Sequence, residues 1–338
     1  MRRTLNPPNR FTDSHIDWDG APPPQKLELL PDASRSILSK NTSPDIPASY
    51  GLNPYRGCSH ACAYCFARSY HEHLGFSVGT DFERRIVVKH DAPALLEAAL
   101  RAPSWRGEPI AMSQVTDPYQ PVERKLNITR RCLDVLARYR NPTTIITRSP
   151  LILRDRDLLA SLAEHDAVRV HISIPIFDPV LCRAVEPGTA PPAARLAAIE
   201  ALAAAGIPVG VSLAPVIPHL SDALIPAALQ AARAAGARWA WMGLVRLPDG
   251  VDAYFEERLR ATLPDRADAV MRALRAMRGG ETNDRRFGKR MRGSGPAWEA
   301  TRQLYRIWVR KLGLAPAPPH PDPSPFRVPG QGTQAALF

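Results

Sequence analysis

The sequence predicts an α/β protein built on a parallel sheet, and two regularities in the chain support this fold class. Short apolar and β-branched runs recur between positions 49 and 244, and stretches with helical periodicity separate them. Strands that alternate with helices pair in parallel, because each helix returns the chain to the same end of the sheet. The expected strands are 49–56, 109–113, 143–147, 168–174, 207–213 and 238–244.

The segments between these strands have helical signals. A helix over 129–140 places Cys132, Leu133 and Leu136 on one face. Gly206 is a stop signal for the alanine-rich helix before it, and Ser221 is a candidate N-cap for the next one. The expected helices are 61–73, 129–140, 155–164, 192–205 and 221–235, followed by 252–263, 266–277 and 296–312.

The ends of the chain differ from this repeating middle part. Residues 1–45 are polar and interrupted by prolines, which predicts a partly ordered arm, and residues from 315 onward are proline-rich, which predicts a tail. The expected organisation is therefore an N-terminal arm at 1–45, a strand–helix domain at 46–245, a C-terminal helical extension at 246–314 and a tail at 315–338.

Composition limits the compartment and the partners. The net charge of +11 and a pI near 9.8 favour an anionic partner such as DNA or RNA, although an arginine-rich proteome gives the same balance. Five cysteines, an odd number with three in one cluster, do not suggest a secreted disulfide framework. The N-terminus lacks an apolar signal region, and no apolar run reaches the roughly 18 residues of a membrane span. We expect a cytoplasmic protein without membrane segments; its oligomeric state is not predicted.

Three cysteines stand close together in the segment CSHACAYCF. Cys58, Cys62 and Cys65 are spaced by four and then three positions, so one loop can turn their sulfurs towards a compact metal centre. Structural zinc requires four protein ligands and would have to recruit a nearby histidine, and none has a usual zinc-finger spacing. An iron–sulfur cube held by three cysteines leaves one iron open to a small molecule. The histidines considered for zinc are His60, His71 and His73.

The pattern C-x3-C-x-aromatic-C, with Tyr64 at the aromatic position, resembles the cluster motif of the radical S-adenosylmethionine (SAM) superfamily. The resemblance covers about residues 46–245 and implies a partial (β/α)6 TIM-type barrel. It also implies two cofactors, a [4Fe–4S] cluster and SAM, and reductive cleavage of SAM to a 5′-deoxyadenosyl radical. An electron donor such as flavodoxin or ferredoxin is then required.

Further motifs resemble the branch of this superfamily that contains spore photoproduct lyase. They are NPYRG before the cysteines, SQVTDPYQPVE after the second strand, and Glu186-Pro187 after the fourth. The resemblance implies that Ser113 meets the SAM amino group, Arg148 its carboxylate and Ser173 its ribose, with Tyr64 beside the cluster and the adenine. A guanidinium matches a carboxylate in a bidentate manner.

The polar loop after the second strand also supplies candidates for substrate contact. These are Asp117, Gln120 and Glu123, and the alternative is a rigid proline-bracketed turn in which Asp117 caps a helix. Tyr119 in this loop is a candidate catalytic residue.

Two positions depart from spore photoproduct lyase. Phe66 stands where that enzyme has a tyrosine after the third cysteine, and the strand 110–114 lacks its hydrogen-donating cysteine. Cys182 is a substitute candidate for the donor, although a lone cysteine is more often a small buried apolar residue. The lyase reaction itself is therefore not predicted.

One basic segment concentrates the positive charge, since RRFGKRMR at 285–292 contains five cations and no acid. In single-stranded or distorted nucleic acid, cations can contact the phosphates while apolar side chains beside them contact the bases. The alternative interpretation of this segment is a solvated connector between helices. The candidates are Arg285, Arg286, Lys289, Arg290 and Arg292.

Three classes of function remain open from the sequence. The first is a radical SAM enzyme acting on a nucleic-acid base or lesion. The second is a radical SAM enzyme acting on a peptide, a protein or a small metabolite. The third is a non-enzymatic metal- or nucleic-acid-binding module.

Overall fold

The computed structural model describes residues 6–11, 26–45 and 48–330. Its larger sheet has seven strands, and every neighbouring pair is parallel except β2 with β3. The predicted α/β class with parallel strands is confirmed. In spatial order the strands are β10 (Ala240–Leu244), β9 (Val209–Val216), β8 (Val168–Ser173), β7 (Thr143–Thr147), β6 (Ile110–Met112), β3 (Tyr50–Leu52) and β2 (Leu38–Lys40).

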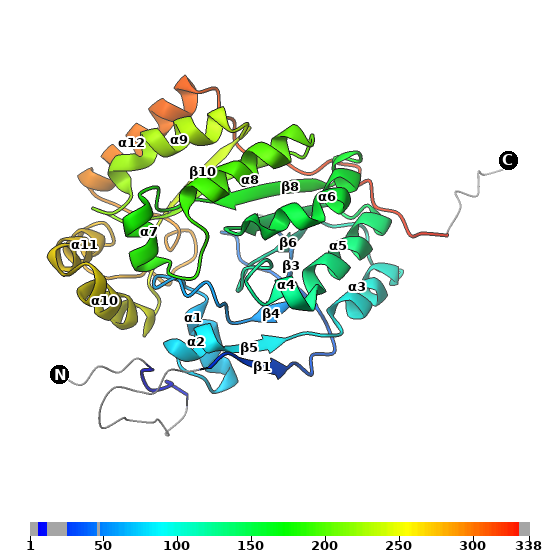
Figure 1. Cartoon of the computed structure of the whole chain (residues 1–338), viewed down its shortest axis with the longest axis horizontal. Coiled ribbons are helices and arrows are strands. Elements are labelled where there is room, and N and C mark those ends of the chain that lie inside the picture. Colours follow the sequence, from blue (N-terminus) through cyan, green and yellow to red (C-terminus); the bar gives the residue numbers. More distant parts are fainter. Residues whose placement is uncertain (1–5, 12–25, 46–47, 331–338) are drawn as a thin grey trace.

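Helices follow the parallel strands and cover the sheet (Figure 1). Ile145, Val170 and Val211, on three adjacent strands, have no exposed surface, and α6, α8 and α9 contact the sheet. Burial of such side chains gives about 25 cal/mol per Å² of apolar surface and is the main driving force for this arrangement. The helices and 3-10 turns are α3 (Ala92–Arg101), α4 (Glu123–Leu126), α5 (Ile128–Tyr139), η2 (Pro150–Asp155), α6 (Arg156–Ala163), α7 (Pro179–Val185), α8 (Pro192–Ala204), η3 (Asp222–Leu224) and α9 (Ile225–Ala234).

The region after β10 is helical, as the periodicity predicts. Figure 1 shows α10 and α11 side by side, whereas α12 packs on α9. These helices are α10 (Val251–Thr262), α11 (Pro264–Ala276) and α12 (Pro296–Lys311). The division of the chain into separate domains stays a prediction. In the described parts of the chain no helix is long and apolar enough to cross a membrane.

Both terminal segments contact the rest of the protein where they are described. Strand β2 pairs with β3, and a three-stranded sheet is formed by β1 (Glu28–Pro31), β5 (Arg85–Val88) and β4 (Tyr55–Arg56). Near the other end, the Arg169 guanidinium donates to the carbonyl of Pro319 at 3.0 Å, and Thr144 bonds His320 at 2.9 Å. The segment after α12 therefore lies against the beginnings of β7 and β8.

The helix expected over 61–73 is wrong for most of its length. Only α1 (Arg68–His71) and the 3-10 turn η1 (Glu72–Leu74) are helical, and α2 (Thr80–Arg84) follows. Ala61 has a φ of +56°, a left-handed conformation that a helix cannot contain. The cysteines therefore lie on an irregular loop before α1.

Candidate active site

The cysteine loop begins at the end of β4 and runs to α1. Cys58 and Cys62 are buried, Cys65 is half-buried, and all three are free thiols. Gly57 enters the loop with a φ of +78°, and a Cβ there would lie 2.9 Å from the Phe82 carbonyl oxygen. A glycine is therefore required where the chain turns into the loop.

The polar loop after β6 holds the cysteine loop. The Gly57 carbonyl accepts hydrogen bonds from Thr116 Oγ1 at 2.7 Å and from Gln120 Nε2 at 3.2 Å. The Ser59 amide donates to Gln120 Oε1 at 2.9 Å. Gln120 has no exposed surface, so its amide serves the loop and is not presented to a substrate in this structure.

Asp117 has a similar internal role. It accepts hydrogen bonds from Thr147 Oγ1 at 2.6 Å and from the Arg148 amide at 3.0 Å, and it lies 3.3 Å from His60 Nδ1. Burial alone would raise the Asp117 pKa, but His60 and Arg148 outweigh burial and hold it below its ordinary value. Conversely, burial would lower the His60 pKa, but Asp117 and Cys58 raise it to about 9. His60, a histidine considered for zinc, is thus paired with a carboxylate.

Glu123 and Tyr119 are also buried completely. Glu123 accepts hydrogen bonds from the Tyr55 hydroxyl and from Arg154 Nη2, the latter at 2.7 Å. It also accepts from the Thr129 amide at 3.0 Å and so fastens the start of α5. The alternative interpretation of the loop as a rigid structural turn therefore describes these side chains better than direct substrate contact.

Two of the residues expected to bind SAM, Arg148 and Ser173, are linked to the cysteine loop. Arg148, directly after β7, donates from Nη1 to Cys62 Sγ at 3.3 Å and from Nη2 to Ser173 Oγ at 3.4 Å. Its buried Nε has no hydrogen-bond partner among the described residues. Ser113 has a φ of +90° and donates its hydroxyl to the Thr116 carbonyl at 2.7 Å. The ends of β7 and β8 thus bring Arg148 and Ser173 to the cysteine loop, whereas the Ser113 side chain contacts the polar loop after β6.

The segment after α7 supports the cysteine loop from another direction. The Tyr64 hydroxyl donates to Glu186, which also forms an ion pair with Arg195 at 2.5 Å, and both partners of this pair are fully buried. A Cβ at Gly188 would lie 2.4 Å from the Ser59 carbonyl oxygen, so glycine permits this close approach. Cys182 Sγ lies 3.4 Å from Glu186 Oε2, and burial raises its pKa to about 11.

A buried arginine that sequence reasoning missed connects the cysteine loop with the C-terminal extension. Arg68 donates to the Cys62 carbonyl at 2.9 Å and pairs with Glu83 at 2.5 Å. Its guanidinium carbon lies 4.3 Å from the centre of the Tyr254 ring on α10, and the Tyr254 hydroxyl donates to Glu83 at 2.7 Å. No sequence motif indicates this pairing, because Glu83 and Tyr254 are distant from Arg68 along the chain.

Replacing Arg68 with methionine is expected to destabilise the apoprotein by about 3–5 kcal/mol, because Glu83 would remain as an unpaired buried charge. Urea unfolding of the cluster-free protein measures this free energy. The control is Arg85→Met, which breaks the exposed pair with Glu28 and is expected to cost less than about 1 kcal/mol. Equal effects of the two substitutions would contradict the structural role of Arg68.

The basic segment is anchored near the carboxyl end of β10. Arg278 donates to the Leu244 carbonyl at 3.2 Å and to the Arg290 carbonyl at 3.2 Å. Arg290 forms an ion pair with Asp45 at 2.7 Å. Two exposed members are also paired, Arg285 with Asp249 and Arg286 with Asp284. Within the described residues, neither Lys289 nor Arg292 forms a side-chain ion pair.

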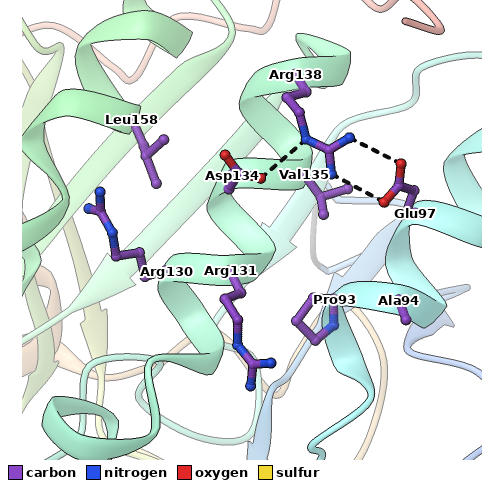
Figure 2. A pocket seen from close by; sticks show the side chains of 9 residues that line it. All are labelled: Pro93, Ala94, Glu97, Arg130, Arg131, Asp134, Val135, Arg138 and Leu158. Atoms are coloured by element: carbon purple, nitrogen blue, oxygen red, sulfur yellow. Dashed lines mark hydrogen bonds and ion pairs between the residues drawn. The ribbon is translucent and has the colours of Figure 1, made fainter.

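A separate cavity of about 490 Å³ lies on the outer surface, between α3, α5 and α6. Figure 2 shows Arg138 between Glu97 and Asp134, with Arg130 and Arg131 at the same hollow. None of the sequence-predicted site residues lines it.

The three thiols lie on one loop but are not gathered around a single point in this structure. In the described ranges no group of three His, Cys, Asp or Glu side chains is arranged to hold one metal ion. An iron–sulfur cube binds its cysteines at separate corners and does not need them around a single point. A family model described as the radical SAM superfamily matches residues 52–232, which is more than half of the chain.

The chain belongs to the radical SAM superfamily. The cofactors of this family are a [4Fe–4S] cluster and SAM. The non-enzymatic alternative is not supported.

Curated relatives match over part of their length. An uncharacterized protein of Mycobacterium tuberculosis is 46% identical over 177 residues, which are 52% of each chain. An uncharacterized protein of Methanocaldococcus jannaschii is 29% identical over 197 residues, 58% of this chain and 71% of that protein. The chain spans about half the length of the mycobacterial relatives that it matches.

Solved structures of spore photoproduct lyase share the fold. The structure with a dinucleoside spore photoproduct has a TM-score of 0.60 and 17% identity, covering 89% of this chain and 86% of that chain. A point mutant of the same enzyme has a TM-score of 0.59 and 18% identity, covering 89% and 86%. The predicted partial TIM-type barrel is thereby confirmed, and the predicted resemblance to spore photoproduct lyase is confirmed as a likeness of fold.

Proposed function

We propose that Cys58, Cys62 and Cys65 ligate the [4Fe–4S] cluster and leave its fourth iron for SAM. The support is their position on one loop. This loop contacts the polar loop after β6, Arg148 after β7, the segment after α7 and Arg68 of α1. Arg148 lies 3.3 Å from Cys62 Sγ, and its positive charge favours the thiolate that ligation requires. When bound, the cluster supplies the electron that cleaves SAM to a 5′-deoxyadenosyl radical.

The polar groups around this loop support the SAM-binding roles that the family resemblance implies. The unpartnered Nε of Arg148 is available to the SAM carboxylate, and charge-assisted bonds of this kind are strong. Ser113 donates its own hydroxyl proton to Thr116, so its oxygen is free to accept from the SAM amino group. We assign Ser173 to the ribose and Tyr64 to a position beside the cluster and the adenine, as the family resemblance implies.

Arg148→Ala is expected to weaken SAM binding by about 10- to 100-fold, because a charge-assisted hydrogen bond to the carboxylate is removed. Equilibrium binding of SAM to the anaerobically reconstituted protein measures the change, with iron and sulfide content determined on the same sample. Arg148→Lys, which keeps the charge without the planar fork, should recover only part of the affinity. Unchanged affinity in the alanine variant would remove Arg148 from the SAM site.

The substrate that we propose is a nucleic-acid base or lesion. The observation that carries this proposal is the basic segment, which is anchored at the end of β10, where the strand ends open towards the cysteine loop. In parallel barrels reactive groups gather at this end of the strands. The proposed partners are DNA or RNA and an electron donor such as flavodoxin or ferredoxin, in a reducing cytoplasm.

A second candidate is a peptide, a protein or a small metabolite. It is favoured by the ion pairs of Arg285, Arg286 and Arg290, which offset part of the positive charge. The deciding experiment incubates the reduced enzyme with SAM and deuterium-labelled DNA or RNA. Deuterium in 5′-deoxyadenosine supports the nucleic-acid substrate, whereas SAM cleavage without deuterium transfer from either nucleic acid contradicts it.

A further inference from the structure

Residues in register on β8, β9 and β10 form one row across the sheet. This row begins at Ser173, one of the proposed SAM-binding residues, and ends on the edge strand β10. Ser173 of β8 pairs in register with Ser212 of β9, and Ser212 pairs with Trp241 of β10. Residues in register on neighbouring parallel strands point to the same face of a sheet. Trp241 therefore shares a face with Ser173, which contacts Arg148 at 3.4 Å.

Trp241 leaves much of its indole exposed although it lies within the sheet. Its side chain is 46% exposed, and within the described residues it has no aromatic or cationic neighbour. Gly243 on the same strand keeps the ring clear, because a Cβ there would lie 3.2 Å from the indole. Ala214 of β9 lies near Gly243 and adds only a methyl group, since a Cβ at Gly243 would lie 3.9 Å from its Cβ.

Trp239 on the same face is a buried tryptophan with a structural role. It is only 2% exposed, and its indole N–H lies 3.4 Å from His171 Nδ1. Gly210 makes room for it, since a Cβ there would lie 2.1 Å from the ring. Trp239 thus fills the barrel near the beginning of β10, whereas Trp241, one layer closer to the strand ends, is left open.

The segment after β10 carries a cation that lies against the cysteine loop. Arg246 follows β10, and its guanidinium carbon lies 4.2 Å from the centre of the Phe66 ring, directly after Cys65. In the part of the chain that the structure describes, Arg246 has no ion pair with an acid. Arg290 of the basic segment is close enough to oppose its charge. The end of β10 therefore carries an open aromatic ring, and a half-buried cation without an ion pair among the described residues follows this strand.

We propose that Trp241 stacks on the planar ring of the target nucleobase and that Arg246 binds a phosphate beside it. This inference rests on the proposed nucleic-acid substrate and adds how that substrate is held. Aromatic stacking tolerates any base, while a guanidinium next to it selects for a charged backbone. Because Trp241 is in the same row as Ser173, a base stacked on its indole would lie on the side of the sheet that carries the proposed SAM-binding side chains.

The test compares binding of short single-stranded DNA to the reconstituted parent, Trp241→Ala and Trp241→Phe proteins, each also with a strand that has one abasic position. The alanine variant is expected to bind intact strands about tenfold more weakly and to lose the preference for intact over abasic DNA. Phenylalanine should restore most of the affinity. Trp308→Ala, on α12, is the matched control and should bind as the parent does.

Separate readouts distinguish the failure of this inference from that of the proposed function. Cluster content and SAM affinity should be unchanged in Trp241→Ala, because the proposed contact is to the base and not to the cofactor. If the variant binds intact and abasic DNA as the parent does, the stacking role is overturned and the nucleic-acid substrate stands. Weaker SAM binding in this variant would instead place Trp241 at the cofactor and also overturn the stacking role. If the parent binds neither DNA nor RNA, the nucleic-acid substrate itself is overturned.

Discussion

Replacing any one of Cys58, Cys62 and Cys65 with alanine is expected to remove the cluster. The anaerobically prepared parent should contain about four irons and four sulfides per chain, with the broad visible absorption of thiolate-to-iron charge transfer. A cube with only two protein ligands is not retained, because two of its irons would be open to exchange. Iron and sulfide analysis together with the visible spectrum measures the loss.

Cys132→Ala is the matched control. Cys132 is a free, fully buried thiol on α5, in the hydrophobic core, so its removal should lower stability but leave the iron and sulfide content unchanged. Retention of the cluster in all three loop variants would contradict the assignment. Stoichiometric zinc in protein produced with ample iron would also contradict it.

The second large effect is expected at the basic segment. Replacing Arg285, Arg286, Lys289 and Arg292 together with glutamine should strongly weaken nucleic-acid binding, because these exposed cations are the ones able to meet phosphates. Lys289 and Arg292 should contribute most to the binding affinity. The charges of Arg285 and Arg286 are already offset by Asp249 and Asp284. The slope of log affinity against log salt should fall by about one unit for each phosphate that the protein no longer binds.

Arg290 is treated separately because its pair with half-buried Asp45 attaches the segment to the chain before β3. Its replacement should loosen the segment and weaken binding by displacement of the other cations. The control for the four exposed cations is an equal change of net charge on α12, at Arg302, Arg306, Arg310 and Lys311. Equal losses in both variants would indicate a non-specific effect of net charge. An unchanged affinity and salt slope would favour a peptide or metabolite substrate.

The strand–helix order and the cysteine motif were predictable because their signals are local. The run at 143–147 is a buried strand whatever packs on it, since β-branched residues favour extended chain and apolar residues favour burial. The cysteine spacing likewise limits the metal chemistry without reference to any other part of the chain. The convergence of Arg148 and Ser173 was also foreseeable, because both follow or end adjacent parallel strands.

The roles of Gln120, Glu123 and Asp117 were not predictable from local signals. The polar side chains of a loop after a strand can contact either a substrate or a neighbouring loop. Only the hydrogen bonds of the buried Gln120 to Gly57 and Ser59 show which contact is made here. The helix predicted over 61–73 was wrong for a related reason. Hydrogen bonds from distant segments hold the cysteine loop in an irregular conformation, and these tertiary contacts outweigh its helix propensity.

The sequence by itself determined the fold class, the cysteine loop and the family, because strand composition, helical periodicity and thiol spacing act over short stretches of chain. The tertiary structure alone decided that Arg68 connects the cysteine loop to Glu83 and Tyr254, and that Trp239 is buried while Trp241 is open. These outcomes depend on which distant residues become neighbours. Burial and ion pairing are properties of that neighbourhood, so no local pattern contains them.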